Sequence, residues 1–306
     1  MFKKTTLLFF ILLFFAPQFA FSVGSSFLEV SPAVAEMVLT KPEETKTLEI
    51  TFSNKSEEFL DLQLSISDFR EKDLTAQVEF LPNSSSYEYS LVSFLSLSHN
   101  YLVLEPNGKQ KIKVTVKNRD DLSPGGHYAA VIAKIAGEKN KKQEGTIISP
   151  SVSALILLRK VGGEKFNLSL KEVDWPKALF VSHYPQKVNL LFQNEGNIHI
   201  IPYGVAEIKD VLGRTIYKGV INFSSAYVFP SSRRFIEIEM GKTGFSWPVS
   251  VNRLEVRGHD SLNVASFSYR DSFIYIQPLV AFVITLTILG LIIKKVKRAK
   301  QLKDKK

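Results

Sequence analysis

The stretch DDLSPGGHYAAV, residues 120–131, holds the groups with the clearest potential for chemistry. His127 follows two aspartates, the composition of a general base oriented by a carboxylate, and the two glycine amides before it suit an oxyanion or a phosphate. Such a site needs an activated nucleophile or a second histidine nearby, and a phosphate loop needs a strand-to-helix switch after it. The surrounding sequence has neither, so the catalytic interpretation is the weaker one.

A structural role suits the same residues better. The Pro-Gly pair has the composition of a tight turn, and the second glycine permits a positive φ. Tyr128, Ala130 and Ile132 then share one face of the strand that follows. An Asp-rich turn shortly before such a tyrosine is typical of the tyrosine corner of Greek-key sandwiches, in which the hydroxyl bonds to upstream backbone. The predicted structural turn consists of Asp121, Pro124, Gly125, Gly126 and Tyr128.

Other side chains that bind metals are scattered along the chain. No two of the five histidines stand at i+2 or i+4, so a zinc site would need ligands from distant loops. Asp68, Glu71 and Asp73 lack the spacing of a calcium loop. The absence of cysteine excludes disulfides, thiolate sites and a cysteine nucleophile. We therefore expect no metal, no cofactor and no enzymatic activity.

The two tryptophans, Trp175 and Trp247, each precede a proline. An exposed tryptophan can stack on a sugar ring, which makes Trp175 a candidate for binding a wall glycan. The alternative is a tryptophan that plugs the base of a sandwich or the joint between two domains.

The N-terminus predicts export. Lys3 and Lys4 precede a short apolar run, and a small-x-small pattern follows at residues 20–22. A basic start, a short apolar core and a small-residue site are typical of a secretory signal peptide, so residues 1–22 are assigned to one.

The C-terminus predicts anchoring. Residues 273–293 carry no charge, and at about 1.5 Å per helical residue they match the thickness of a bilayer core. The tail, residues 294–306, carries eight positive side chains and one aspartate, which indicates a cytoplasmic location. The prediction is a single-pass type I protein of the cell membrane with its domains outside. The alternative is a buried core helix with a solvated tail.

The positive charge of the chain comes from its ends. The formal net charge is +9, and the tail and the two N-terminal lysines account for all of it. The segment between them is neutral, so no basic patch for nucleic acid is expected on the folded domains.

In the exported segment, apolar and polar residues alternate with period two. Leu60, Leu62 and Leu64 are interleaved with polar residues, and so are Ile236 and Ile238. This alternation and the Pro- and Gly-containing turns are typical of half-buried strands. No long helical period occurs before the apolar segment near the C-terminus. The sequence therefore predicts an all-β fold of two tandem immunoglobulin-like β-sandwiches and one C-terminal transmembrane helix.

A faint internal repeat supports two domains. Residues 48–54 match residues 188–194 in the pattern apolar-x-apolar-x-Phe-x-Asn, and residues 106–112 match residues 230–236. We assign residues 23–161 to the first sandwich and 162–272 to the second. The boundary falls at Gly162-Gly163, which can loosen the chain.

The first domain holds sixteen extra residues between the two repeated strands. They are assigned to the polar segment 70–90, which carries Phe80, Tyr87 and Tyr89. Aromatic residues flanked by serine and asparagine supply contact area at low entropic cost, so these three are candidate binding residues. The alternative is an ordinary hairpin that covers a sheet edge.

The sequence resembles the WxL-interacting proteins of Gram-positive cell surfaces. Residues 28–56 look like the opening strands of that family, residues 102–132 like the strands around its Pro-Gly-x-Tyr turn, and residues 189–214 like the start of its second domain. The resemblance implies a first domain that binds peptidoglycan and a second that binds a partner protein.

The function expected is that of a membrane-anchored, extracellular binding or scaffolding protein whose partner is a cell-wall polymer or a secreted surface protein. One alternative is a membrane-tethered, chaperone-like protein that donates or accepts strands. The other is a hydrolase acting on the wall, which needs a clustered nucleophile, base or metal.

Overall fold

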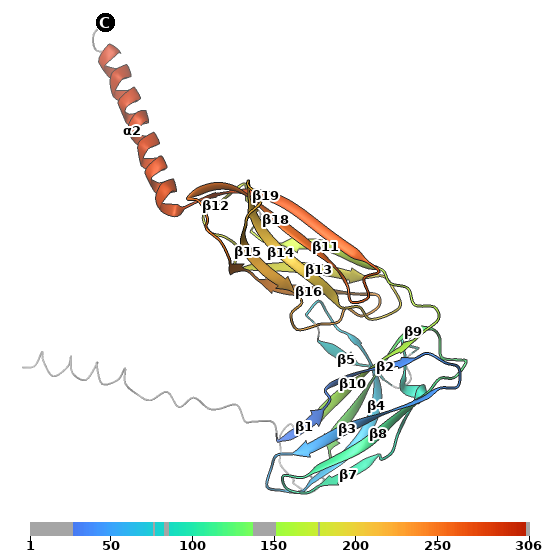
Figure 1. The fold of residues 1–306 in the computed structure, drawn as a ribbon. Coiled ribbons are helices and arrows are strands. Elements are labelled where there is room, and N and C mark those ends of the chain that lie inside the picture. Colours follow the sequence, from blue (N-terminus) through green and yellow to red (C-terminus); the bar gives the residue numbers. More distant parts are fainter. Residues whose placement is uncertain (1–26, 76, 83–85, 137–150, 177, 304–306) are drawn as a thin grey trace, which may run out of the picture.

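A computed structural model describes residues 27–75, 77–82, 86–136, 151–176 and 178–303. Two β-sandwiches follow one another along the chain, and a long helix leads away from the second (Figure 1). Each sandwich has its own cluster of buried apolar side chains, as the predicted fold class requires. The signal peptide predicted for residues 1–22 lies outside the described residues.

The first sandwich consists of two sheets with the strand orders β1-β3-β8-β6 and β2-β10-β9-β4, and both β5 and β7 also pair with β4. All pairs are antiparallel except β2 with β10. A short 3₁₀ turn, η2 (Val92–Phe94), precedes β6. The strands are β1 (Leu28–Ser31), β2 (Val34–Leu39), β3 (Thr45–Asn54), β4 (Leu60–Glu71), β5 (Val78–Phe80), β6 (Leu95–Leu97), β7 (Tyr101–Leu104), β8 (Lys109–Lys117), β9 (Gly125–Ile135) and β10 (Ser151–Lys160).

The second sandwich repeats this plan with one strand fewer in the smaller sheet. Its sheets have the orders β11-β13-β16 and β12-β19-β18-β14-β15-β17. β12 runs parallel to β19, as β2 does to β10. The strands are β11 (Leu168–Asp174), β12 (Phe180–Val181), β13 (Lys187–Asn194), β14 (Pro202–Asp210), β15 (Thr215–Ile221), β16 (Ser232–Glu239), β17 (Gly241–Lys242), β18 (Val249–Asp260) and β19 (Ser266–Ile276).

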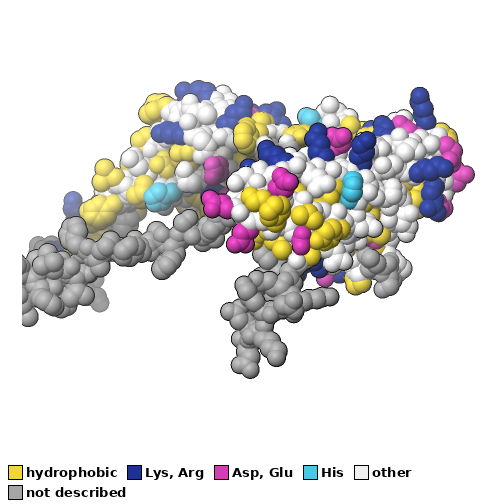
Figure 2. All heavy atoms as spheres, turned by 90° about the horizontal axis from the view of Figure 1, so that it is seen from below, with side chains coloured by type: hydrophobic (Ala, Val, Ile, Leu, Met, Phe, Trp, Pro, Cys, Tyr) yellow, Lys and Arg dark blue, Asp and Glu magenta, His cyan; other side chains and the backbone are white. Residues whose placement is uncertain are grey.

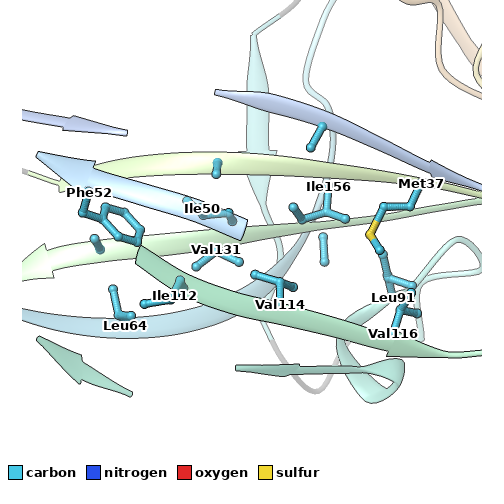
Figure 3. Close-up of a cluster of buried hydrophobic side chains, with 14 of the residues drawn as sticks. Met37, Ile50, Phe52, Leu64, Leu91, Ile112, Val114, Val116, Val131 and Ile156 are labelled. Atoms are coloured by element: carbon cyan, nitrogen blue, oxygen red, sulfur yellow. The ribbon is translucent and has the colours of Figure 1, made fainter. Parts of the chain in front are cut away.

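The alternating residues of the sequence form the two cores. Ile50 and Phe52 from β3 lie opposite Val131 from β9 in the first sandwich, between the two sheets (Figure 3). Ile236 and Ile238 of β16 are buried in the second. Each fully buried aliphatic side chain contributes about 1.5–3 kcal/mol, so side chains of this kind hold the two sheets of each sandwich together.

The internal repeat corresponds to the same strand pair in both domains. β3 pairs with β8 and β13 pairs with β16, both antiparallel. The buried Asn54 donates to the carbonyls of Glu58 and Glu105, and its oxygen accepts from the amide of Ser56. Asn194 makes the equivalent bonds in the second domain. The repeated asparagine therefore secures the loop after the strand, because it satisfies buried backbone groups there.

The helix α2 (Pro278–Lys303) starts later than the sequence predicted. The segment assigned to a span from Phe273 begins as part of β19, because the Phe273 ring is buried against Trp175 with 5.2 Å between ring centroids. Residues 278–298 are long and apolar enough to cross a membrane. The first residues of the predicted tail continue the same helix.

Candidate binding surfaces

The imidazole ring of His127 lies against backbone carbonyls. The Nε2 of His127 lies 2.8 Å from the carbonyl of Ser123, and the Nδ1 lies 3.1 Å from the carbonyl of Ser90. Burial lowers the pKa of His127. Asp121 pairs with Arg119 instead of orienting the imidazole. The ring therefore ties the turn before β9 to a neighbouring loop, and its two nitrogens face protein carbonyls.

The turn differs from the predicted one in two respects. Gly125, and not Gly126, has the positive φ, +119°. Gly126 is needed for space, because a Cβ there would lie 2.2 Å from the hydroxyl of Tyr128. The tyrosine-corner prediction was wrong as well, since the hydroxyl of Tyr128 lies 3.2 Å from Nδ1 of His199 in the second domain.

Tyr128 belongs to an aromatic cluster between the two sandwiches, named here the joint cluster. The ring of Phe229, from the second domain, lies 4.9 Å from that of Tyr128 and 5.6 Å from that of Phe69, edge to face. Edge-to-face pairs of this kind contribute about 0.5–1.5 kcal/mol beyond their burial. The residues of the joint cluster are Phe69, Tyr128, Ala130, Ile132, Leu157 and Phe229.

Polar contacts also join the two domains beside the joint cluster. Nε2 of His199 lies 3.4 Å from a carboxylate oxygen of Glu36, and this hydrogen bond lowers the pKa of Glu36. On another side, the hydroxyl of Ser232 donates to Glu71 at 2.6 Å. The two domains are therefore joined by both apolar packing and hydrogen bonds.

Glu71 makes the joint sensitive to pH. Burial raises the pKa of Glu71 from its ordinary value of 4.5. The folded protein then holds this proton at a higher pH than the unfolded chain does, so Glu71 lowers the stability as the pH rises through that window. A Glu71→Gln variant cannot titrate there.

The free energy of unfolding of Glu71→Gln minus that of the natural protein is expected to increase between about pH 4 and about pH 7. Urea unfolding of both proteins at each pH measures this difference. A difference that stays constant or falls with pH would contradict the assigned environment of Glu71.

The candidate binding residues of segment 70–90 fall in different places. β5 pairs with the end of β4, where Arg70 and Glu79 form an ion pair at 2.9 Å. Tyr87 and Tyr89 are half-buried, with 5.7 Å between their ring centroids, and the hydroxyl of Tyr89 lies 3.4 Å from that of Ser231. Phe80 remains exposed. The two tyrosines thus lie at the joint, and only Phe80 faces solvent.

The two tryptophans also separate. Trp175 is buried in the second core, and its Nε1 donates to the hydroxyl of Tyr269. Trp175 therefore fills the base of the second sandwich, as in the alternative given from the sequence, and its buried ring leaves no face on which a sugar could stack. Trp247 is half exposed and lies edge to face with Phe245, 5.2 Å between centroids.

The outer edge of β16 is a sheet edge that the first sandwich covers at the equivalent position. In the first sandwich β6 pairs with the outer edge of β8. In the second, no described strand pairs with the outer edge of β16, the strand equivalent to β8. The amide of Phe235 points outward, because it donates to the carbonyl of Leu74 at 3.0 Å. Antiparallel alternation places the amides of Glu237 and Glu239 on the same side.

A groove runs along this edge between β16 and β15. Its volume is about 520 Å³, and Val220, Phe223 and Phe235 form its apolar part. Phe223 is 90% exposed, which is unusual for a side chain of this size. The acidic side chains of Glu237 and Glu239 line the same groove. At its other end, Gly219 brings β15 close to β16, since a Cβ there would lie 2.6 Å from the carbonyl oxygen of Glu239.

Sequence reasoning did not single out this groove. The sequence signal for the open edge is the interval between the two repeated segments, which is longer in the first domain than in the second. From the sequence alone, this difference indicates an insertion in the first domain. The longer interval in the first domain holds β4, β5, β6 and β7, whereas the shorter one in the second holds β14 and β15. The same difference therefore also reflects β6, an edge strand that has no counterpart among the described residues of the second sandwich.

Metal-binding residues add no further site within the described residues. They contain no group of three or more histidine or acidic side chains that could hold a metal ion. Figure 2 shows one face of the molecule, on which Lys and Arg side chains and Asp and Glu side chains both occur.

No protein-family model and no curated protein match the chain. Among solved structures, it is similar to the class 5 fimbriae chaperone CfaA, with 12% identity, a TM-score of 0.40, and coverage of 80% of this chain and 98% of that one. It is also similar to the CupB2 chaperone of Pseudomonas aeruginosa, with 13% identity, a TM-score of 0.35, and coverage of 78% and 97%. At these TM-scores the likeness supports no argument about what the chain binds.

Proposed function

We propose that this protein is a membrane-anchored, extracellular binding protein without enzymatic activity, and that it holds an extended segment of a secreted surface protein along β16. The observation that carries the proposal is the outer edge of β16: no strand of the described residues pairs with it, whereas β6 pairs with the equivalent edge of β8 in the first sandwich. An extended segment added at a sheet edge gains affinity from main-chain hydrogen bonds and specificity from pockets for alternate side chains.

The chemistry of the groove defines the segment. Side chains that enter the groove would contact Val220, Phe223 and Phe235, so they are expected to be apolar. Side chains next to Glu237 and Glu239, which line the same groove, are expected to be basic or polar. A protein segment meets both requirements, whereas a wall glycan offers no ladder of amides and carbonyls.

The chain itself contains a precedent for this mode of binding. The carbonyl of Leu74, in the turn of the hairpin between β4 and β5, already accepts from the outward amide of Phe235. The outward amide of Phe235 is thus satisfied by the first domain, and those of Glu237 and Glu239 come next along the edge. The hairpin therefore marks one end of the proposed binding site.

The membrane anchor is the helix α2. It is long and apolar enough for a span, and Lys294, Lys295, Lys297 and Arg298 follow its apolar part. Together with the predicted signal peptide, this arrangement supports a type I orientation with both sandwiches outside. The resemblance to WxL-interacting proteins supports a surface protein as the partner of the second domain.

The test is site-specific photo-crosslinking on native cells with a photoreactive residue at position 223. We expect one secreted protein to be captured through an extended segment. Glu237→Pro removes an outward amide without touching the bonds to β13, since proline is tolerated on edge strands. This variant is expected to lose the adduct at equal expression.

Glu237→Ala is the matched control, because it removes the same side chain but keeps the amide. It is expected to retain most of the adduct. A second probe at Phe59, which is exposed on the first domain, reports non-specific capture. An adduct that Glu237→Pro leaves unchanged, or one formed only with glycan, would refute the proposed site.

A further inference from the structure

Exposed apolar side chains gather at the end of the second sandwich from which α2 leaves. They come from three loops or strand ends, and Leu212 is 72% and Trp247 52% exposed. This set, named here the apolar rim, consists of Leu179, Phe180, Val211, Leu212, Phe245 and Trp247.

Strand register places the whole rim at one end. The carbonyl of Pro248, next to Trp247, accepts from the amide of Gln277, the residue between β19 and α2. The carbonyl of Leu179 accepts from the amide of Ile274. On the other side of β18, Asp210 pairs with Asn252, so the turn at Val211 and Leu212 extends in the same direction. The rim is therefore level with the start of the helix.

Stacked aromatic rings lie behind the rim at this end of the sandwich. The ring of Tyr184 is stacked between those of Tyr217 and Tyr275, at 4.7 Å and 4.3 Å between centroids. The connection to α2 is a single residue, Gln277, because β19 ends at Ile276 and the helix begins at Pro278. One residue spans at most about 3.6 Å, so the rim cannot be far from the surface that α2 enters.

We infer that the apolar rim inserts into the interface of the bilayer beside α2. Tryptophan and phenylalanine next to aliphatic side chains are the composition of segments that bury a few ångströms into the headgroup region. The inference rests on the proposed membrane anchoring and adds a second contact with the lipid. The helix α2 and the apolar rim together fix the tilt of the second sandwich relative to the bilayer. The helix alone, with its one-residue connection, would allow that tilt to vary.

The lipid contact has a consequence for binding. The rim lies at the membrane end of the second sandwich, and Phe223 follows Ile221, whose partner in β14 is Gly204, near the opposite end. With the rim held in the interface, the part of the groove around Phe223 points away from the bilayer. A secreted partner can then reach β16 without crossing the headgroup layer.

The test uses tryptophan fluorescence of the full chain reconstituted in phosphatidylcholine vesicles. Trp175→Phe leaves Trp247 as the only tryptophan in the chain. We expect its emission to be lost in vesicles of brominated lipid and to resist aqueous iodide. The matched control carries Phe223→Trp in a Trp175→Phe, Trp247→Phe background, and it is expected to show the reverse pattern.

Flotation of the vesicles reports anchoring separately from the rim. A floating protein whose Trp247 responds to iodide and not to brominated lipid would overturn the inference and leave the anchor intact. Protection from both quenchers would assign the rim to contact between protein copies and would also overturn it. Failure to float would overturn the anchor and the rim together. If Trp175→Phe does not fold, the difference in tryptophan emission between the natural protein and Trp247→Phe reports the quenching of Trp247 instead.

Discussion

Replacing Phe192 with alanine is expected to lower the free energy of unfolding of the second sandwich by about 3–5 kcal/mol. The ring is fully buried and lies edge to face with Phe267, 4.8 Å between centroids. Alanine would remove most of its contacts and leave a cavity that a close-packed core fills only in part.

Urea unfolding of the full chain, followed by the fluorescence of the buried Trp175, measures this loss. Phe223→Ala is the control, since Phe223 is an exposed side chain of the same type in the same domain, and it is expected to change the stability by less than about 0.5 kcal/mol. Equal shifts in the two variants would contradict the assignment of Phe192 to the core.

Asn194→Ala is expected to lower the free energy of unfolding of the second sandwich by about 2–3 kcal/mol, nearly as much as Phe192→Ala does. The loss comes from hydrogen bonds and not from packing. The Asn194 side chain donates to the carbonyls of Ile198 and Val228 and accepts from the amide of Gly196. Alanine leaves buried backbone groups without this partner, and water cannot reach them freely.

The repeat supplies an internal check on this value. Asn54→Ala removes the equivalent bonds from the first sandwich and is expected to destabilise it by a similar amount. Lys187→Ala breaks the exposed ion pair with Glu237 and is expected to cost less than about 1 kcal/mol. Differential scanning calorimetry separates the two sandwiches if they unfold in turn. A small effect for Asn194 with a large one for Asn54 would contradict the shared role.

The fold was predictable because its determinants are local. Apolar residues at alternate positions, such as Ile112 and Val114, identify strands with one buried face, and the repeated asparagine identifies the same strand in both domains. The start of the helix was not predictable in this way. Phe273 is apolar whether it lies in a core or in a bilayer, and only its contact with Trp175 distinguishes the two.

The candidate site was less predictable because it depends on contacts between distant elements. Tyr128 has the sequence context of a tyrosine corner, yet its hydroxyl meets His199 of the second domain. Tyr87 and Tyr89 have the composition of a binding loop, yet they lie at the joint. The open edge of β16 follows from the absence of a pairing strand in the part of the chain that the structure describes, and such an absence appears in the sequence only as a change of spacing.

Amide hydrogen exchange along β16 tests the central claim most directly. In the full chain alone, the amides of Glu237 and Glu239 are expected to exchange rapidly, while those of Ile236 and Ile238, which face β13, are expected to be protected. With the captured secreted protein bound, Glu237 and Glu239 are expected to become protected as well. Outward amides that are already protected without a partner, or that stay unprotected with it, would contradict binding at the open edge of β16.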